Sequence, residues 1–226
     1  MCIRDRFNML SGYSEPKKWN KLAVAPIWLK DKFLMLIGRE AENARQGKKA
    51  RIVAKMNSLC DPMIMNALYD ASKAGVKIEL IVRGICCIKA GVPGLSDNIS
   101  VRSIVGNYLE HSRIFYFYND GFEDIYMGSA DWMPRNLDKR VEITFPVEDP
   151  ELKKKIKNIL KIQLEDTLKA HIMQPDGSYA KQDLRGKAKL DSQMYFVKLA
   201  QESQKPVKEE DNDRVFIPVE SHGDNE

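Results

Sequence analysis

Short apolar runs alternate with longer amphipathic stretches along the chain, and this pattern predicts alternating strands and helices. Leu22–Ala25 is an apolar run that ends at Pro26 and predicts a strand. Trp28–Arg45 carries apolar residues at helical spacing and predicts a helix that ends before Gly47. Arg51–Met56 is a second run of strand type. These stretches predict the order strand, helix, strand.

The next predicted helix is the most clearly marked element. Asp61 is its N-cap, Pro62 occupies the first helical position and Gly75 follows the last turn. Val76–Val82 is a nearly unbroken run of β-type residues, typical of a strand that is buried on both faces. Together with Arg51–Met56, these elements predict a βαβ unit with parallel strand pairing.

Further elements follow the same periodicities. Strands are predicted at Ile99–Ile104, Arg113–Tyr118, Ile125–Met127 and Val141–Phe145. Glu148–Ala170 predicts a long helix with Asp149 as N-cap and Pro150 at its first position. The predicted buried stripe of this helix consists of Leu152, Ile156, Ile159, Leu160, Leu164 and Leu168. One more helix is indicated by Tyr195, Phe196 and Leu199. We therefore predict an α/β sheet flanked by helices over residues 7–204.

Composition narrows the class of protein. Of 226 residues, 43% are hydrophobic and 30% charged, as in globular domains. No apolar run approaches the roughly 20 residues of a membrane helix, and no signal peptide pattern is visible. The cysteines Cys2, Cys60, Cys86 and Cys87 lack C-x-x-C spacing, so neither a zinc site nor a disulfide framework is predicted. Cys60, Cys86 and Cys87 are interpreted as buried free thiols in a cytoplasmic protein.

Charge is spread unevenly along the chain. The net charge is +4, yet Lys205–Glu226 holds three basic and seven acidic residues, so this tail carries −4 and the rest +8. A basic body fits a polyanionic ligand. The tail, residues 205–226, is predicted to be disordered because it offers little to bury. Met1–Arg6 (residues 1–6) fits nothing that follows and is interpreted as a sequence artefact.

Candidate phosphate-binding residues follow the predicted strands. Ligands of open α/β sheets bind at the carboxyl ends of the strands, where Arg83 and Gly84 stand. The planar fork of arginine matches phosphate, and glycine lets the backbone approach a ligand closely. A surface arginine beside a structural glycine is the alternative, and local chemistry leaves it open.

A second group of candidates surrounds His111, which directly precedes a predicted strand. In an extended chain Arg113 shares its face, and the pair suits developing phosphate charge. Ser129, after Gly128, can present a hydroxyl and a backbone N–H to an anion. A structural histidine, and a strand-to-helix turn with Asp131 as N-cap, remain the alternatives. No metal site is predicted.

The order of these residues resembles half of a phospholipase D-type site. That superfamily has H-x-K, an aspartate a few residues later and then G-S-x-N. Here Arg113 replaces the lysine, Tyr118 stands where the aspartate is expected, and Asp131 replaces the asparagine. The resemblance implies a phospholipase D-like mixed sheet flanked by helices, but the departures argue against a self-sufficient phosphodiesterase.

Six stretches taken in order resemble the last domain of type 1 polyphosphate kinases, from about Phe7 to about Ala180. They are Gly12–Ser14, Lys55–Leu59, Val82–Cys86, Gly94–Ile99, Tyr108–His111 and Gly128–Met133 with Arg135–Asn136. The resemblance implies reversible transfer of the ATP terminal phosphate to inorganic polyphosphate, with ATP and ADP as substrates. It also implies that Arg83 and His111 contact the nucleotide phosphates, and that His111 takes a catalytic part.

The same resemblance places the phosphorylated histidine and the magnesium-binding arginines of the family in preceding domains. We therefore expect this chain to be inactive alone, with inorganic polyphosphate, ATP and those domains as partners, and no nucleic acid. Homo-oligomers are implied, and membrane association is left open. Two other functions remain: a non-catalytic polyphosphate- or nucleotide-binding module, and a phospholipase D-like phosphodiesterase, which the broken H-x-K…N signature disfavours. A histidine-containing domain upstream in the parent gene would separate the enzyme from the binding module.

Overall fold

The computed structural model describes residues 7–8, 21–182, 184–186 and 188–203. The interpreted artefact at Met1–Arg6, the first family stretch at Gly12–Ser14 and the predicted tail after Gln204 lie outside these residues. The chain divides into two compact units, residues 1–193 and 194–226. The described part of the second unit continues helix α5 (Ser192–Ser203), which confirms the helix predicted near the end of the chain.

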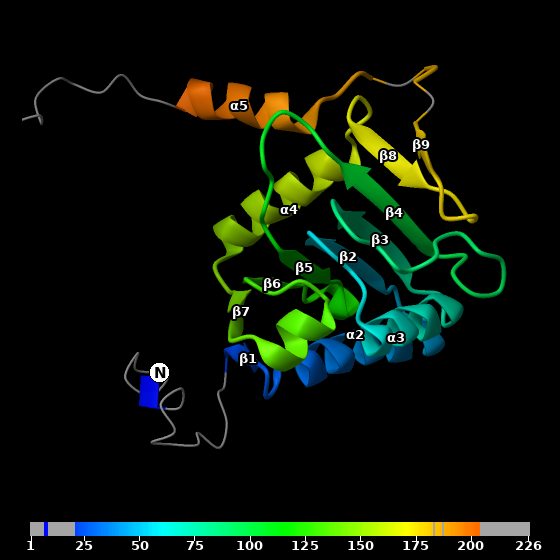
Figure 1. The fold of residues 1–226 in the computed structure, drawn as a ribbon, viewed down its shortest axis with the longest axis vertical. Helices are drawn as coiled ribbons and strands as arrows, with labels where there is room; N and C mark the ends of the chain where they lie inside the picture. The colour runs from blue at the N-terminus through cyan, green and yellow to red at the C-terminus, as the bar shows by residue number, and fades with distance from the viewer. Residues whose placement is uncertain (1–6, 9–20, 183, 187, 204–226) are drawn as a thin grey trace, which may run out of the picture. The chain divides into compact units, whose positions relative to one another are not determined.

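The first unit is built on a mixed sheet, in the order β1-β7-β6-β5-β2-β3-β4-β8-β9 (Figure 1). Among the strand pairs of the described residues, β2·β3 and β3·β4 are parallel and the others are antiparallel. The strands are β1 (Ala23–Ala25), β2 (Arg51–Met56), β3 (Lys77–Val82), β4 (Ile99–Ile104), β5 (Ile114–Phe117), β6 (Asp124–Gly128), β7 (Glu142–Val147), β8 (Ala170–Met173) and β9 (Tyr179–Lys181). The predicted α/β fold with a mixed sheet is confirmed.

Helices cover both faces of this sheet. Helices α2 (Leu29–Arg45) and α3 (Pro62–Lys73) lie side by side against one face, and α4 (Pro150–Leu164) lies against the other (Figure 1). Asp61 caps α3 by accepting a hydrogen bond from the Ile64 N–H at 3.0 Å. The predicted βαβ unit is therefore confirmed, since β2 and β3 pair in parallel on either side of α3. The first compact unit also contains two short helical turns, at Asn119–Gly121 and Arg135–Lys139.

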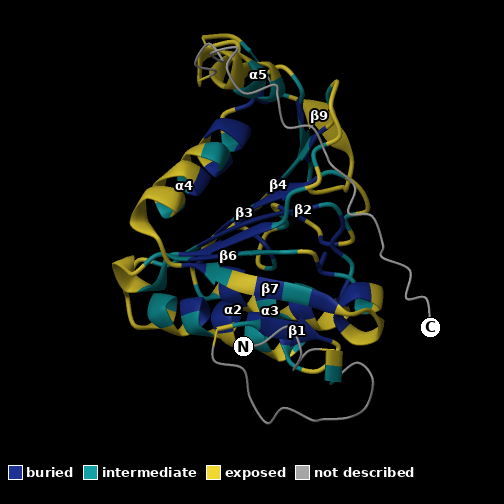
Figure 2. Ribbon diagram, turned by 90° about the vertical axis from the view of Figure 1, so that its left-hand side faces the viewer, coloured by how far each residue is buried: buried dark blue, intermediate teal, exposed yellow. Residues whose placement is uncertain are grey.

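Strand β2 shows why the central strands carry apolar residues on both of their faces. Ile52, Ala54 and Met56 belong to the core that packs beneath α2 and α3, whereas Val53 packs with Leu160 of α4. Successive side chains of a strand point to opposite faces, so a strand covered on both faces carries apolar residues on both; in β2 the exceptions are Arg51 at its beginning and Lys55, whose buried ammonium is paired with Glu110. The central strands are accordingly buried in Figure 2.

The helix predicted over Glu148–Ala170 is wrong in its second half, because α4 ends at Leu164. The buried carboxylate of Asp166 turns the chain by accepting hydrogen bonds from the N–H groups of Lys169 and Ala170, at 2.8 and 3.1 Å. It also accepts from the N–H and hydroxyl of Ser192, at 2.7 and 2.6 Å. The chain then enters β8, which pairs with β4.

The predicted stripe of α4 is confirmed at its centre and wrong at its ends. Ile156 and Leu160 are buried, but Leu152 is 50% exposed and Leu168, beyond the helix, is 41% exposed. Strands β8 and β9 were not predicted. Both lie at one edge of the sheet, and β9 is exposed throughout, so burial left little periodic trace in its sequence.

The cysteines differ in their surroundings. Cys60, Cys86 and Cys87 are free, as predicted. Burial raises the pKa of the Cys60 thiol, and burial raises that of the Cys86 thiol to about 11. Cys87 is exposed, so the interpretation of this residue as buried is wrong. Cys87 directly follows Cys86, which forms a parallel bridge with Leu59, and its N–H donates to the Leu59 carbonyl at 2.8 Å.

Candidate active site

The sheet brings the candidate residues together at one end of its central strands, along the edge that runs across the strand ends. Strands β2, β3 and β4 run in parallel and end there, whereas β5 is antiparallel to β2 and begins there. Strand β6 is antiparallel to β5 and therefore ends at the same edge. Asn57, Arg83, His111, Arg113 and Ser129 all lie within three residues of these strand ends. We call the edge of the sheet at which these five residues lie the site edge.

Arg83 follows β3 and is half-buried. Its Nε and Nη2 atoms both donate to Oδ1 of Asn57, at 3.0 and 2.5 Å. Gly84 comes next, and its N–H donates to the Asn57 carbonyl at 2.7 Å. A Cβ on Gly84 would lie 2.9 Å from that carbonyl oxygen, so the close approach of the two loops requires glycine.

Arg113 has its fork occupied within the protein. Nε and Nη2 donate to the two carboxylate oxygens of Asp131, at 3.1 and 3.2 Å. Nη1 donates to the carbonyl of His111 at 3.0 Å. The Asp131 side chain is 6% exposed and that of Arg113 12% exposed, which makes this a buried ion pair. Arg113 therefore anchors the backbone of His111 and retains two N–H donors.

A second anchor holds the segment just before β5. The buried ammonium of Lys55 donates to the Ser112 carbonyl at 2.9 Å and lies 3.1 Å from Oε1 of Glu110. Burial lowers the pKa of Lys55, and the charges of Arg83 and Arg113 add to the shift, although Glu110 opposes it. Burial alone would raise the pKa of Glu110, but hydrogen bonds from Ser112 and the charge of Lys55 outweigh it and lower that pKa.

His111 is exposed, and both anchors flank it. Ser129 is also exposed, but its hydroxyl accepts the Ile143 N–H at 3.1 Å, and its own N–H donates to the Ile143 carbonyl at 3.0 Å. A Cβ on Gly128 would lie 2.5 Å from the same carbonyl. The Gly-Ser pair therefore joins β6 tightly to β7, and the predicted contacts of His111 and Ser129 with phosphate stay predictions.

The recess that Lys55, Arg83 and Glu110 share has a volume of about 20 Å³. This is room for about one water molecule. A group the size of phosphate would therefore not fit inside this recess. Within the described ranges, no group of three histidine, cysteine or acidic side chains could hold a metal ion.

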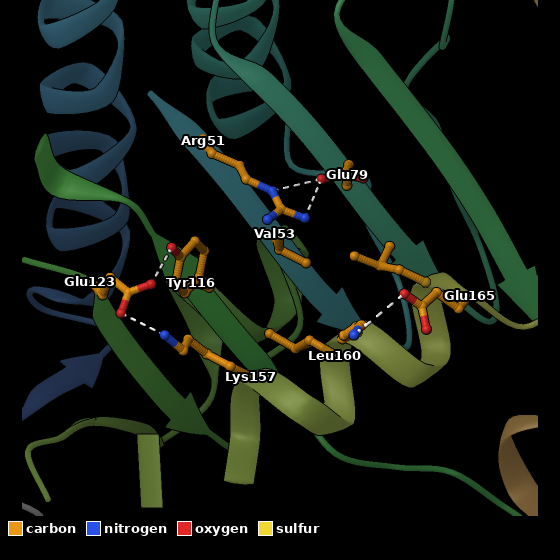
Figure 3. A pocket seen from close by; sticks show the side chains of 10 residues that line it. Arg51, Val53, Glu79, Tyr116, Glu123, Lys157, Leu160 and Glu165 are labelled. Atoms are coloured by element: carbon orange, nitrogen blue, oxygen red, sulfur yellow. Dashed lines mark hydrogen bonds and ion pairs between the residues drawn. The ribbon is translucent and has the colours of Figure 1, made fainter. Parts of the chain in front are cut away.

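A roomier cavity of about 430 Å³ lies between α4 and the beginning of β2, at the other end of the strands (Figure 3). Its cations all have acidic partners: Arg51 pairs with Glu79 at 2.6 Å and Lys157 with Glu123 at 2.6 Å. The third pair, Lys161 with Glu165, is looser at 3.9 Å. Charges matched in this way do not favour a polyanion. The cavity is lined from the first half of β2 by Arg51 and Val53, whereas the site edge follows the last residue of this strand.

Sequence reasoning missed Lys55 and Asn57 as parts of the site. Both stand in the family-like stretch Lys55–Leu59, which was the available signal. The role of Asp131 was also missed, because the sequence offered it only as a possible N-cap or as the replacement for the asparagine of the phospholipase D-type motif. Its carboxylate instead binds Arg113 and accepts the Asn57 N–H at 2.8 Å.

Comparisons with known proteins identify the family of this chain. The family model for polyphosphate kinase C-terminal domain 2 matches residues 22–193. Polyphosphate kinase of Thermosynechococcus vestitus is 52% identical over 177 residues, which are 78% of this chain and 24% of the relative. Polyphosphate kinase of Lactiplantibacillus plantarum is 50% identical over 199 residues, 88% of this chain and 28% of the relative.

A solved structure shows the same fold. The crystal structure of polyphosphate kinase from Porphyromonas gingivalis matches with a TM-score of 0.81 and 39% identity, over 89% of this chain and 32% of that one. This chain thus spans about a quarter of the length of the curated relatives it matches. In the described residues no helix is long and apolar enough to cross a membrane. The chain belongs to the family of polyphosphate kinase C-terminal domains.

Proposed function

We propose that this chain forms one wall of a polyphosphate kinase active site, where the terminal phosphate of ATP is transferred reversibly to inorganic polyphosphate. The observation that supports this most directly is that the guanidinium of Arg83 has no acidic partner among the contacts described above. It is held by a neutral amide, whereas Lys55 and Arg113 beside it are paired with acidic groups. Among these three described cations, Arg83 alone offers an uncompensated charge to an anion.

The roles follow from phosphoryl-transfer chemistry, which depends mainly on positioning and charge stabilisation. Arg83 binds and neutralises phosphate oxygens. His111, exposed between its two anchors, contacts the transferred phosphate and assists proton transfer. The remaining N–H donors of Arg113 and the loop at Ser129 supply further contacts. ATP binding, a cytoplasmic location and assembly into homo-oligomers belong to the same proposal.

We propose that other domains complete this site. Among the described residues no group of three histidine, cysteine or acidic side chains could hold a metal ion, and the family resemblance assigns magnesium and the phosphorylated histidine to preceding domains of the enzyme. Losing one wall of a phosphoryl-transfer site removes much of its charge stabilisation. The purified 226-residue chain should therefore make no polyphosphate from ATP, and measurable polymer synthesis would contradict the proposed division of labour.

The test of the site uses the full-length enzyme. Arg83→Ala should raise the KM for ATP or lower kcat about tenfold or more, because a charged phosphate donor is lost. Arg83→Lys should restore only part of the activity, since the fork is gone. His111→Ala should lower kcat more than it affects binding. Arg45→Ala is the matched control, because Arg45 is exposed on α2.

Two outcomes would favour the other functions. Binding of polyphosphate or ATP without any transfer by the full-length protein would indicate a binding module. Cleavage of a phosphodiester substrate would indicate a phospholipase D-like enzyme. Wild-type kinetics in both Arg83→Ala and His111→Ala would refute the site assignment.

A further inference from the structure

Asn57 takes part in the site with all four of its polar groups. Its N–H donates to Asp131 at 2.8 Å, and its carbonyl accepts from Gly84 at 2.7 Å. Its side-chain Nδ2 donates to the hydroxyl of buried Ser58 at 3.1 Å, while Oδ1 accepts twice from Arg83. A polar network in which every member is satisfied is rigid and specifies one arrangement.

The orientation of the Asn57 amide follows from the same contacts. Reversing the amide would place its Nδ2 donor against the Nε and Nη2 donors of Arg83. Both of these arginine nitrogens would then lose their acceptor. Only one orientation is therefore compatible with the position of the guanidinium. Arg83 in turn has two N–H groups bound to Asn57, which leaves three of its five for a ligand.

The two arginines of the site edge are held by different chemistry. Arg113 is bound by the carboxylate of Asp131, which compensates its charge. Arg83 is bound by an amide oxygen of Asn57, which fixes its position but leaves the charge in place. The Asp131 carboxylate also accepts the Asn57 N–H, so one acidic group binds Arg113 directly and anchors the residue that holds Arg83.

We propose that Asn57 is a positioning residue that orients Arg83 toward a phosphate anion while leaving its positive charge uncompensated, with Asp131 as the anchor of Asn57. This inference rests on the proposed function, because it assumes that Arg83 binds phosphate. It explains why a neutral side chain stands at this position: an aspartate would hold the fork equally well but would cancel its charge.

Asn57→Asp separates positioning from folding. The substitution is isosteric, keeps an acceptor for Arg83 and can still accept the Ser58 hydroxyl. The urea midpoint of the 226-residue chain should therefore stay at or above the wild-type value. Its affinity for inorganic tripolyphosphate, measured by isothermal titration calorimetry, should fall about tenfold, or about 1.4 kcal/mol. Asn158→Asp adds the same charge on exposed α4 and should leave the affinity unchanged.

A double-mutant comparison tests whether Asn57 acts through Arg83. Arg83→Ala alone should also weaken tripolyphosphate binding about tenfold, and Asn57→Asp added to it should cost little more. Additive losses, or wild-type affinity in Asn57→Asp, would overturn the inference alone. Wild-type affinity in Arg83→Ala, or no binding by the wild-type chain at millimolar tripolyphosphate, would overturn the assignment of Arg83 as a phosphate ligand of this chain, and the inference with it.

A spectroscopic measurement keeps the inference testable even if Asn57→Asp does not fold. The Nε–H signal of Arg83, assigned by its loss in Arg83→Ala, should exchange slowly with water in the wild-type chain. It should exchange faster in Asn57→Ala, while the signal of Arg113 stays protected by Asp131. An Arg83 signal that exchanges as fast in the wild type as that of exposed Arg45 would contradict the held geometry.

Discussion

The buried ion pair of Asp131 and Arg113 predicts a large and specific stability loss on Asp131→Asn. The substitution keeps the shape of the side chain and an acceptor for the Asn57 N–H, but it removes the charge and turns an NH₂ group toward Nη2 of Arg113. Removing one partner of a buried pair costs about 3–5 kcal/mol. Arg113 keeps its bond to the His111 carbonyl and some contact with water, so we expect about 2–4 kcal/mol.

Urea unfolding followed by circular dichroism measures this loss. The midpoint should fall at an unchanged slope, because the surface exposed on unfolding is the same. For a unit of this size the expected loss corresponds to a Tm lower by roughly 5–15 °C. Asp149→Asn is the matched control: Asp149 caps α4 on the surface, and asparagine caps equally well, so the change should stay within about 0.5 kcal/mol. A loss for Asp131→Asn no larger than this control would refute the buried-pair reasoning.

Three further outcomes follow from local geometry. Gly128→Ala should destabilise the fold by about 1–3 kcal/mol in urea unfolding, because its Cβ would meet the Ile143 carbonyl at 2.5 Å. Gly38→Ala should instead stabilise it by about 0.5–1 kcal/mol, because Gly38 is exposed in α2 and its Cβ would contact nothing; equal effects of the two substitutions would contradict the steric argument. Glu110→Gln should cost about 1–2 kcal/mol at neutral pH through the lost pairing with Lys55. Since the folded-state pKa of Glu110 is lowered, its contribution is present above about pH 4.5 and is lost as the pH falls through the lower value, so the two unfolding curves should converge in acid.

Part of the candidate site could be predicted from the strand pattern. A residue that follows a parallel strand lies at its carboxyl end, and this rule placed Arg83 at the correct edge before any tertiary contact was known. The sequence also placed His111 just before the predicted strand Arg113–Tyr118 and Arg113 at its first residue, and the antiparallel pairing of β5 with β2 brings both to the same edge. That these side chains bind phosphate remains a prediction.

The partners of those residues could not be predicted, because they come from distant parts of the chain. Asp131 lies 18 residues from Arg113 and 74 from Asn57, and its fit to the N-cap pattern concealed its charge pairing. Lys55 reads as an ordinary member of a strand, yet it contacts Ser112 at a separation of 57 residues. No local periodicity reports such pairings, since they depend on the order of strands in the sheet.

Helix boundaries show the same division between local and tertiary information. The beginnings of α3 and α4 were determined by the sequence alone, because a capping aspartate followed by proline satisfies the first N–H groups with atoms a few residues away. The end of α4 was decided by the tertiary structure. Its apolar spacing continues past Leu164, but Asp166 turns the chain by binding Ser192, 26 residues later. A buried carboxylate needs several donors, and only the folded chain brings them together.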